Sequence, residues 1–171
     1  MMNKLCIKNG IPLLNIVRRK EQEELLKSEG AEHVLITEGD WEPKYKEYVE
    51  KQGFDCLFDA LGGGPTTKIL IENLPIKSGI YLYGVLENAP LIIEKTGQIL
   101  AGKKIEGFML DNWWGAASEE IKNRVRENYS SYLKGELSTI TYKELTFNEF
   151  EEALELSIKK TIEGKVLMRP V

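Results

Sequence analysis

The sequence is poor in the residues that build metal sites and disulfide frameworks. Its 171 residues include one histidine, His33, and two cysteines, Cys6 and Cys56. A single histidine cannot form a zinc site with two scattered cysteines. The two cysteines lie far apart within apolar runs, which favours buried reduced thiols over a disulfide. We therefore expect no metal site.

The sequence also lacks a long apolar run and a strong charge of either sign. No run approaches the ~18 apolar residues that suggest a membrane span, and the N-terminus has no signal-peptide pattern. The formal net charge of −4 gives no reason to expect nucleic acid or an anionic membrane as a partner. The mitochondrial matrix and the cytoplasm both fit these features.

Hydrophobic residues make up 42% of the chain and charged residues 29%, enough to form a buried core. Short apolar runs alternate with amphipathic segments of about ten residues. The predicted strands are 11–17, 32–37, 54–60, 79–85 and 104–110, and the predicted helices are 1–9, 20–28, 41–52 and 65–74. This alternation predicts an α/β fold with a doubly wound parallel sheet and helices on both faces.

The pattern changes in the second half of the chain. Segment 91–100 is apolar without a clear period, and we expect a short helix or irregular structure there. A helix is predicted at 118–134, then a strand at 139–145, a helix at 149–160 capped by Thr146 or Asn148, and a strand at 165–168. We divide the chain into a nucleotide-binding region, 1–135, and a strand–helix–strand region, 136–171.

Two segments compete as the nucleotide site. The first comprises Arg18, Arg19 and Lys20, directly after the strand at 11–17. In a dinucleotide-binding fold, arginine at the end of the second strand accepts a 2′-phosphate, whereas an acidic residue binds the 2′-hydroxyl. Three cations in a row suit a phosphate dianion, and arginine binds it through forked, charge-assisted hydrogen bonds. The competing interpretation is an ordinary solvated turn.

The second segment comprises Gly62, Gly63 and Gly64, after a predicted strand and before a helix opened by Pro65. Backbone N–H groups there could hold a phosphate, and Glu87 falls near where a ribose-binding acid would stand. The spacing lacks the third glycine of the dinucleotide motif. A tight turn that lets a ligand approach the backbone is the alternative.

No catalytic pair is visible. Asp55, Asp59 and Asp111 flank strands, but none is paired with a histidine, serine or cysteine as a nucleophile and its base would be. Trp113 and Trp114 fall in a predicted polar loop, where they line a pocket, meet a partner or pack against a helix. Hydride transfer needs no such pair in a nucleotide domain, because the cofactor supplies the reactivity.

Taken together, these segments resemble the medium-chain dehydrogenase/reductases over nearly the whole chain. The nearest branch is that of the zinc-free quinone oxidoreductases and the mitochondrial trans-2-enoyl-thioester reductases of fatty-acid synthesis. The stretches that carry the resemblance are 15–20 (NIVRRK), 26–34 (LKSEGAEHV), 58–63 (FDALGG), 83–84 (YG), 105–108 (IEGF) and 164–167 (GKVL). Each is loose alone, but their order and spacing are specific.

The resemblance implies a Rossmann-like fold and NADPH as the cofactor. It assigns the 2′-phosphate to Arg18, Arg19 and Lys20, and makes the three glycines a turn that borders the cofactor. Further cofactor contacts are implied for Tyr83, Gly84, Val85, Leu86, Phe108, Met109, Leu110 and Lys165. Trp113 or Trp114 matches a tryptophan near the substrate pocket, and the substrate class would be an enoyl thioester or a quinone.

The departures from the family concern the start of the fold. The family's first, central strand and its Gly-rich loop precede the helix that opens this chain, and so does a substrate domain. We therefore expect a partner chain or a further N-terminal segment to supply them, in a dimer or a larger assembly, and the chain alone to be inactive. The alternative from another class is a degenerate, non-catalytic structural subunit of a larger complex.

Overall fold

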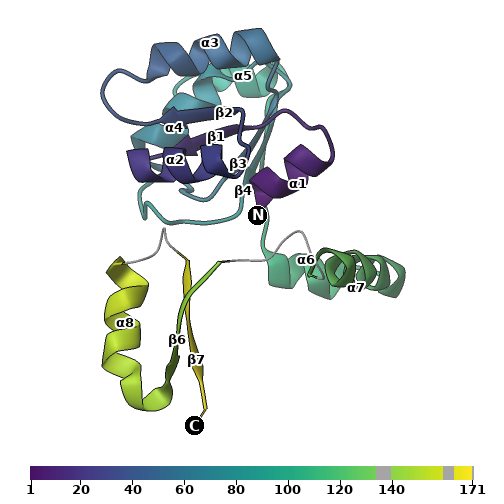
Figure 1. The fold of residues 1–171 in the computed structure, drawn as a ribbon. Coiled ribbons are helices and arrows are strands. Elements are labelled where there is room, and N and C mark those ends of the chain that lie inside the picture. Colours follow the sequence, from purple (N-terminus) through teal and green to yellow (C-terminus); the bar gives the residue numbers. More distant parts are fainter. Residues whose placement is uncertain (134–139, 160–163, 171) are drawn as a thin grey trace. The chain divides into compact units, whose positions relative to one another are not determined.

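The computed structural model describes residues 1–133, 140–159 and 164–170 of the chain. They form two compact units, Met1–Val34 with Asn123–Val171, and Leu35–Lys122 (Figure 1). Among the described residues, no helix combines the length and apolarity that crossing a bilayer requires.

Helices and strands alternate through the first two thirds of the chain, as predicted. The helices are α1 (Met2–Lys8), α2 (Lys20–Ser28), α3 (Glu42–Gln52), α4 (Gly64–Asn73), α5 (Thr96–Leu100), α6 (Leu110–Ala116), α7 (Glu119–Leu133) and α8 (Phe150–Lys159), with a short 3-10 helix η1 (Phe147–Glu149). The strands are β1 (Leu14–Val17), β2 (His33–Ile36), β3 (Cys56–Asp59), β4 (Gly79–Leu82), β5 (Lys104–Gly107), β6 (Thr141–Thr146) and β7 (Lys165–Arg169).

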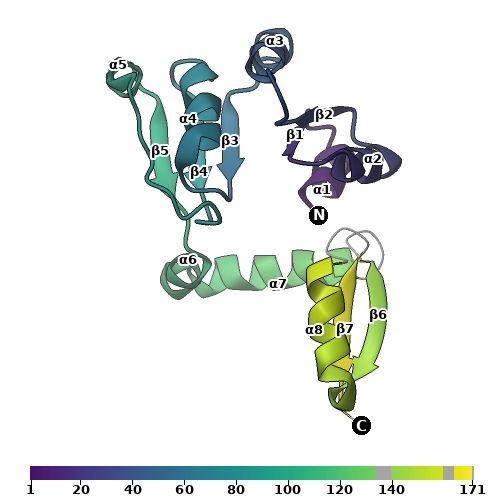
Figure 2. The same ribbon diagram turned by 90° about the vertical axis from the view of Figure 1, so that its left-hand side faces the viewer.

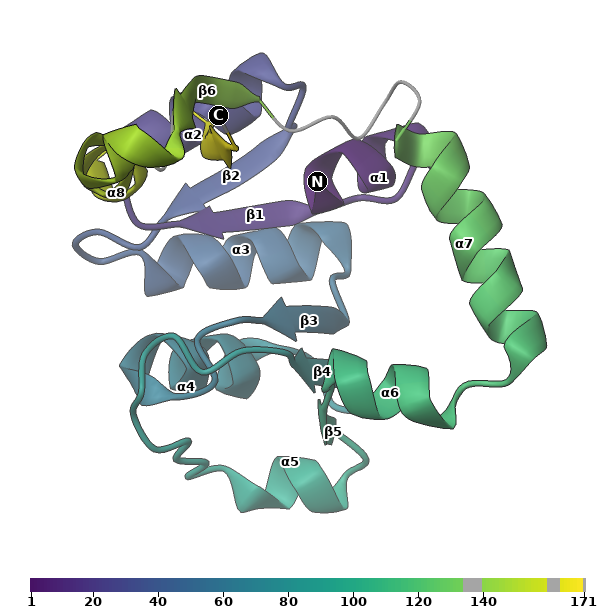
Figure 3. The same cartoon turned by 90° about the horizontal axis from the view of Figure 1, so that it is seen from below.

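In the first unit, β1 pairs with β2, and their arrows point the same way in Figure 3. Helix α2 follows β1 and packs against it. The side-chain oxygen of Gln22 accepts the backbone N–H groups of Arg18 and Arg19, both at 3.1 Å, which closes the amino end of α2. The chain therefore turns tightly from strand to helix at these two arginines.

The second unit contains the three-stranded sheet β3–β4–β5 (Figure 2), whose strands are all parallel. Helix α4 covers one face of this sheet, and its residues Leu70 and Ile71 are buried together with Ile80 of β4. Pro65 occupies the first turn of α4, as expected, because proline has no N–H to lose there. The core of this unit thus lies between α4 and the sheet.

Strand pairing falls into separate ladders. β1 pairs with β2, and β3 pairs with β4, but no described strand pairs with both β1 and β3. The carbonyls of Asp55 and Asp59 accept N–H groups of the β4 strand region at 2.9 Å each. Because alternate residues of a parallel edge strand face opposite sides, the N–H and C=O groups of Cys56 and Phe58 face the open edge. The predicted parallel α/β class is confirmed.

The last elements form a small β–α–β module. β6 and β7 run parallel, with α8 packed against them (Figure 1). Leu145 and Ala153 are buried between helix and strands. The Glu149 carboxylate accepts the N–H and hydroxyl of Thr146, both at 2.8 Å, so Thr146 rather than Asn148 caps this helical segment. The predicted helix therefore begins with the 3-10 turn η1.

Three details of the sequence analysis are wrong. β5 ends at Gly107 rather than at residue 110, and Trp113 and Trp114 lie in helix α6 rather than in a polar loop. Tertiary ring packing of Trp113 against Phe108, with centroids 6.1 Å apart, favours the helix. Cys56 is exposed, not buried, because it lies on the β3 face away from α4; both cysteines are free thiols. The division at residues 135/136 remains a prediction.

Candidate nucleotide-binding site

The basic corner, defined as Arg18, Arg19 and Lys20, lies at the carboxyl end of β1, as predicted. All three residues are exposed. Their backbone is held by Gln22, whereas neither guanidinium forms an ion pair with a residue in the described ranges. Lys20 has one long contact, 3.9 Å to Glu24. A fixed backbone with uncommitted guanidinium groups is suited to binding a phosphate dianion.

The glycine turn, defined as Gly62, Gly63 and Gly64, is held by the buried carboxylate of Asp59. One oxygen of that carboxylate accepts the Leu61 N–H at 3.1 Å, and the other accepts the Gly62 N–H at 2.9 Å. The hydroxyl of Thr67 in α4 donates to the same second oxygen at 2.9 Å. The N–H groups of Leu61 and Gly62 are therefore already used within the protein and are not free to hold a phosphate.

The segment that follows β4, residues 83–90, packs on this turn and is called the post-β4 loop. Leu86 and Glu87 donate their N–H groups to the carbonyls of Ala60 and Leu61, both at 3.1 Å. The Gly64 N–H donates to the Pro90 carbonyl at 3.1 Å. Protein backbone therefore fills the space that a phosphate would need if the glycine turn were a phosphate loop.

Side chains on the post-β4 loop point outward although its backbone is fixed. Val85 and Leu86 are 76% and 78% exposed, and Tyr83 is also exposed. The Phe108 N–H donates to the Leu82 carbonyl at 2.8 Å, so the ends of β4 and β5 lie side by side. The parallel sheet thus brings the predicted residues after both strands to one edge, where they form an exposed apolar rim. The members of this rim are Tyr83, Val85, Leu86, Phe108, Met109 and Leu110.

The two tryptophans of α6 continue this rim. The rings of Phe108 and Trp113 have centroids 6.1 Å apart, and those of Trp113 and Trp114 are 6.2 Å apart. The Lys122 ammonium lies 6.0 Å from the Trp114 ring, within reach of a cation–π contact. An aromatic row beside the rim fits the predicted role of a tryptophan near a substrate.

The predicted cofactor residues belong to both units. The basic corner and Lys165 lie in the first unit, and the apolar rim lies in the second. Lys165 is exposed at the start of β7, and its N–H donates to the Ile140 carbonyl at 2.8 Å. Across the described ranges, no cluster of histidine, cysteine, aspartate and glutamate suits a metal ion.

A buried polar network that the sequence did not predict lies at the amino end of β5, the opposite end of that strand from the rim. Lys103 is 2% exposed. Its ammonium donates to the carbonyls of Ile71 and Leu74 at 2.6 and 2.8 Å. It also donates to the Gln98 side chain at 2.7 Å. Burial, with repulsion from Lys95, lowers the pKa of Lys103. Nothing in the sequence distinguishes this lysine from its exposed neighbour Lys104.

Glu72, in the same network, fixes the chain after the post-β4 loop. Its carboxylate accepts the N–H groups of Glu94 and Lys95 at 2.9 and 3.4 Å and pairs with Lys68 at 3.3 Å. Burial would raise the pKa of Glu72, but the Glu94 N–H and the Lys68 ammonium outweigh it, so the pKa is lowered. This buried acid is charged at neutral pH.

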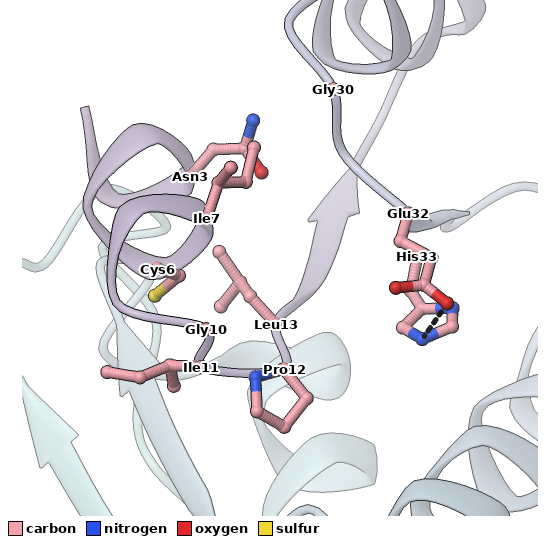
Figure 4. Close-up of a pocket in the computed structure, with 10 residues that line it drawn as sticks. All are labelled: Asn3, Cys6, Ile7, Gly10, Ile11, Pro12, Leu13, Gly30, Glu32 and His33. Carbon is pink, nitrogen blue, oxygen red and sulfur yellow. Dashed lines mark ion pairs between the residues drawn. The ribbon is translucent and has the colours of Figure 1, made fainter. Parts of the chain in front are cut away.

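A cavity of about 330 Å³ lies at the amino ends of β1 and β2, away from the basic corner (Figure 4). Residues of α1, the connection to β1 and the start of β2 line it. The amide nitrogen of Asn3 is buried without a partner in the described residues, while its oxygen accepts from Asn15 at 3.1 Å. His33 and Glu32 border the cavity, and the His33 Nε2 atom lies 3.6 Å from the Glu32 Oε1 atom.

The alternating elements and the parallel strands define a Rossmann-like α/β fold. No family model matches the chain. It is 26% identical over 164 residues to the human mitochondrial enoyl-[acyl-carrier-protein] reductase, covering 93% of this chain and 44% of that protein. Among solved structures, an NADPH:quinone reductase of Mesorhizobium loti is 27% identical, with a TM-score of 0.83, 99% of this chain and 49% of that chain covered.

A second solved neighbour is a complex of Etr1p, which forms part of the mitochondrial 2-enoyl thioester reductase heterodimer of Candida tropicalis. The complex contains NADP and crotonyl-CoA, is 17% identical with a TM-score of 0.73, and matches 97% of this chain and 49% of its own. The chain therefore spans about half the length of the relatives it matches. These likenesses confirm the resemblance to the quinone and enoyl reductases and the Rossmann-like fold.

Proposed function

We propose that this chain is the NADPH-binding portion of an oxidoreductase that reduces an activated double bond of an enoyl thioester or a quinone. The observation that carries the proposal is the basic corner. Arg18 and Arg19 are exposed at the carboxyl end of β1, with guanidinium groups that no described residue pairs. Reductases that use NADPH bind its 2′-phosphate with arginine at this point of the fold.

The apolar rim takes the opposite end of the cofactor. Tyr83, Val85 and Leu86 present exposed side chains at the carboxyl edge of the parallel sheet, where ligands bind in open α/β folds. Phe108, Met109 and Leu110 extend the same apolar surface. When bound, NADPH supplies a hydride to one carbon of the activated double bond, and a proton reaches the other. The rim orients the nicotinamide and excludes water from it.

Lys165, near the end of the chain, contributes a further contact to the cofactor, and Trp113 and Trp114 border the substrate. A flat aromatic surface suits a quinone ring or the conjugated end of an enoyl thioester. No residue of the described ranges is assigned as a proton donor. The relatives support both substrate classes in this proposal, since one is named as an NADPH:quinone reductase and another as an enoyl-[acyl-carrier-protein] reductase.

A second polypeptide segment completes the protein in this proposal. The N–H and C=O groups of Cys56 and Phe58 face the open edge of β3, and both side chains are exposed. A further strand paired with this edge, together with a substrate domain, would cover them. The rate of Cys56 alkylation tests this: we expect fast labelling of the isolated chain and protection in the purified assembly, with buried Cys6 as the internal control.

Titration of the chain with NADPH and NADH tests the cofactor. We expect NADPH to bind about tenfold or more tightly than NADH, because only NADPH carries the phosphate that the arginines bind. Equal binding of the two would contradict the proposal. If neither cofactor binds the complete assembly, while Arg18→Glu/Arg19→Glu leaves that assembly intact, the chain is a non-catalytic structural subunit. The mitochondrial matrix is the proposed location, with the cytoplasm as the alternative.

A further inference from the structure

The glycine turn has a geometry that a simple surface turn does not require. A Cβ atom added to Gly63 would lie 2.0 Å from the Ala89 carbonyl oxygen, and one added to Gly62 would lie 2.3 Å from the Gly84 carbonyl oxygen. Contacts this short with backbone atoms cannot be relieved by rotating a side chain. The post-β4 loop therefore rests directly on the turn, backbone against backbone.

The close approach is reciprocal. A Cβ atom added to Gly84 would lie 2.6 Å from the Ala60 carbonyl oxygen, which also accepts the Leu86 N–H at 3.1 Å. The Tyr83 N–H donates to the Asp59 carbonyl at 2.9 Å. The buried Asp59 carboxylate, in turn, holds the start of the glycine turn. One aspartate therefore ties the end of β3, the glycine turn and the post-β4 loop together.

A second anchor lies just beyond the loop. The carboxylate of Glu72 in α4 accepts the Glu94 and Lys95 N–H groups. The loop is thus fixed at its beginning by Asp59, along its length by the glycine turn, and after its end by Glu72. Between these anchors, Val85 and Leu86 stay largely exposed. Fixed backbone below exposed apolar side chains is what a preorganised binding surface requires.

We propose that the glycine turn is a positioning element for the cofactor. It pins the post-β4 loop before any ligand arrives, so that the nicotinamide half of NADPH meets a rim already in place. The proposal rests on the proposed NADPH-binding function, and it gives the three glycines a role other than phosphate binding. Gly62, Gly63 and Asp59 act through the loop and are positioning residues.

Gly63→Ala is the sharpest test, because it separates packing from backbone strain. The φ of Gly63 is 173°, an extended conformation that any residue adopts. Alanine is therefore opposed by packing alone, from the Ala89 carbonyl and from the Pro90 carbonyl carbon at 3.1 Å. Gly97→Ala is the matched control. Gly97 lies in α5 of the same unit, and nothing lies within 4 Å of a Cβ added there.

Hydrogen exchange of the Leu86 and Glu87 amides measures the pinning without any cofactor. We expect Gly63→Ala to speed this exchange about tenfold or more, while the Ile80 amide of the core and the Gly97→Ala control stay unchanged. Unchanged exchange in a folded Gly63→Ala protein would overturn the proposal. If Gly63→Ala fails to fold, Glu72→Ala is the second variant, because it releases the other anchor. We expect it to speed exchange of the Glu94 and Lys95 amides. Slow exchange of these two amides would also count against a pinned loop.

Ligand binding then separates positioning from mere stability. We expect Gly63→Ala to weaken NADPH about tenfold but to change the affinity for 2′,5′-ADP, which lacks the nicotinamide, by less than about twofold. Equal losses for both ligands, or no loss for NADPH, would overturn the positioning role. If the unaltered protein binds neither ligand, the proposed function fails together with this role, while the exchange data still report whether the loop is pinned.

Discussion

In the proposed function, the basic corner and the post-β4 loop prepare for NADPH in two different ways. At the corner, Arg18 and Arg19 have a fixed backbone and uncommitted charged side chains. At the loop, the backbone is held by Asp59, Glu72 and close glycine contacts, and no charge is presented to the ligand by Val85 or Leu86. In that proposal the corner contributes charge, whereas the loop contributes shape.

This difference predicts that the two regions fail in different ways. Loss of charge at the corner should weaken binding and leave folding unchanged, because the side chains are exposed. Changes beneath the loop should alter stability or loop order, because the groups that hold it are buried. The following experiments compare the regions, in order of decreasing effect.

Charge reversal at the corner should have the largest effect. We expect Arg18→Glu/Arg19→Glu to weaken NADPH binding about a thousandfold, ~4 kcal/mol, because two charge-assisted contacts become repulsions. Calorimetric titration measures this, and the melting temperature should not change. Lys44→Glu/Arg124→Glu reverses two other exposed charges and should have little effect; an equal loss there would mean that net charge, not the corner, governs binding.

Loss of the buried lysine should cause the largest loss of stability. Lys103→Met removes the buried ammonium that donates to the Ile71 and Leu74 carbonyls, and we expect the free energy of unfolding to fall by about 3 kcal/mol. Denaturant unfolding followed by circular dichroism measures it. Lys104→Met, at the exposed neighbouring position, should change stability by less than about 0.5 kcal/mol. Equal effects of the two variants would contradict the network.

Neutralising Asp59 should make the post-β4 loop less ordered, with a smaller loss of stability than Lys103→Met causes. In Asp59→Asn, an amide NH₂ group replaces one of the two carboxylate oxygens that now accept hydrogen bonds from the Leu61 and Gly62 N–H groups. We expect the free energy of unfolding to fall by about 2 kcal/mol. Faster exchange of the Leu86 amide should accompany it. Asp55→Asn, at the exposed start of the same strand region, is the control. A stable Asp59→Asn protein with slow Leu86 exchange would show that the carboxylate does not hold the turn.

Salt should distinguish the two ends of the ligand. Raising the ionic strength from about 0.05 M to about 0.5 M should weaken NADPH binding roughly tenfold, because exposed charges at the corner are screened. Binding of NADH, which lacks the 2′-phosphate, should change by less than about twofold. Parallel titrations of the two cofactors measure this. An equal salt dependence for NADPH and NADH would mean that the charged contacts are made to the diphosphate, which both cofactors share, rather than to the 2′-phosphate.

The pH dependence of stability should show the smallest effect. The folded-state pKa of Glu72 lies below its ordinary value of 4.5, so its charged form stabilises the fold above about that pH. This stabilisation is lost as the pH falls through the lowered pKa. Thermal melts below pH 4.5 should therefore show a decline that is shallower in Glu72→Gln. The same slope in both proteins would mean that other carboxyl groups cause the decline.

Much of the fold could be predicted because hydrophobic period and turn residues report local structure directly. The strand after α1, the helix opened by Pro65 and the final β–α–β elements all appear where the patterns place them. The end of β5 and the helix around Trp113 were missed, since the aromatic contacts that support α6 come from ring packing rather than from periodicity. Element ends are set by such contacts more than by sequence.

The sequence by itself determined the order of strands and helices, the cations after β1 and the likeness to NADPH-dependent reductases. Only the tertiary structure decided what the three glycines do, and that Lys103 and Glu72 are buried while Lys104 is not. The reason is physical: charge and periodicity are properties of neighbouring residues. Burial and the approach of one backbone to another depend on segments more than twenty residues apart, which meet only when the chain is folded.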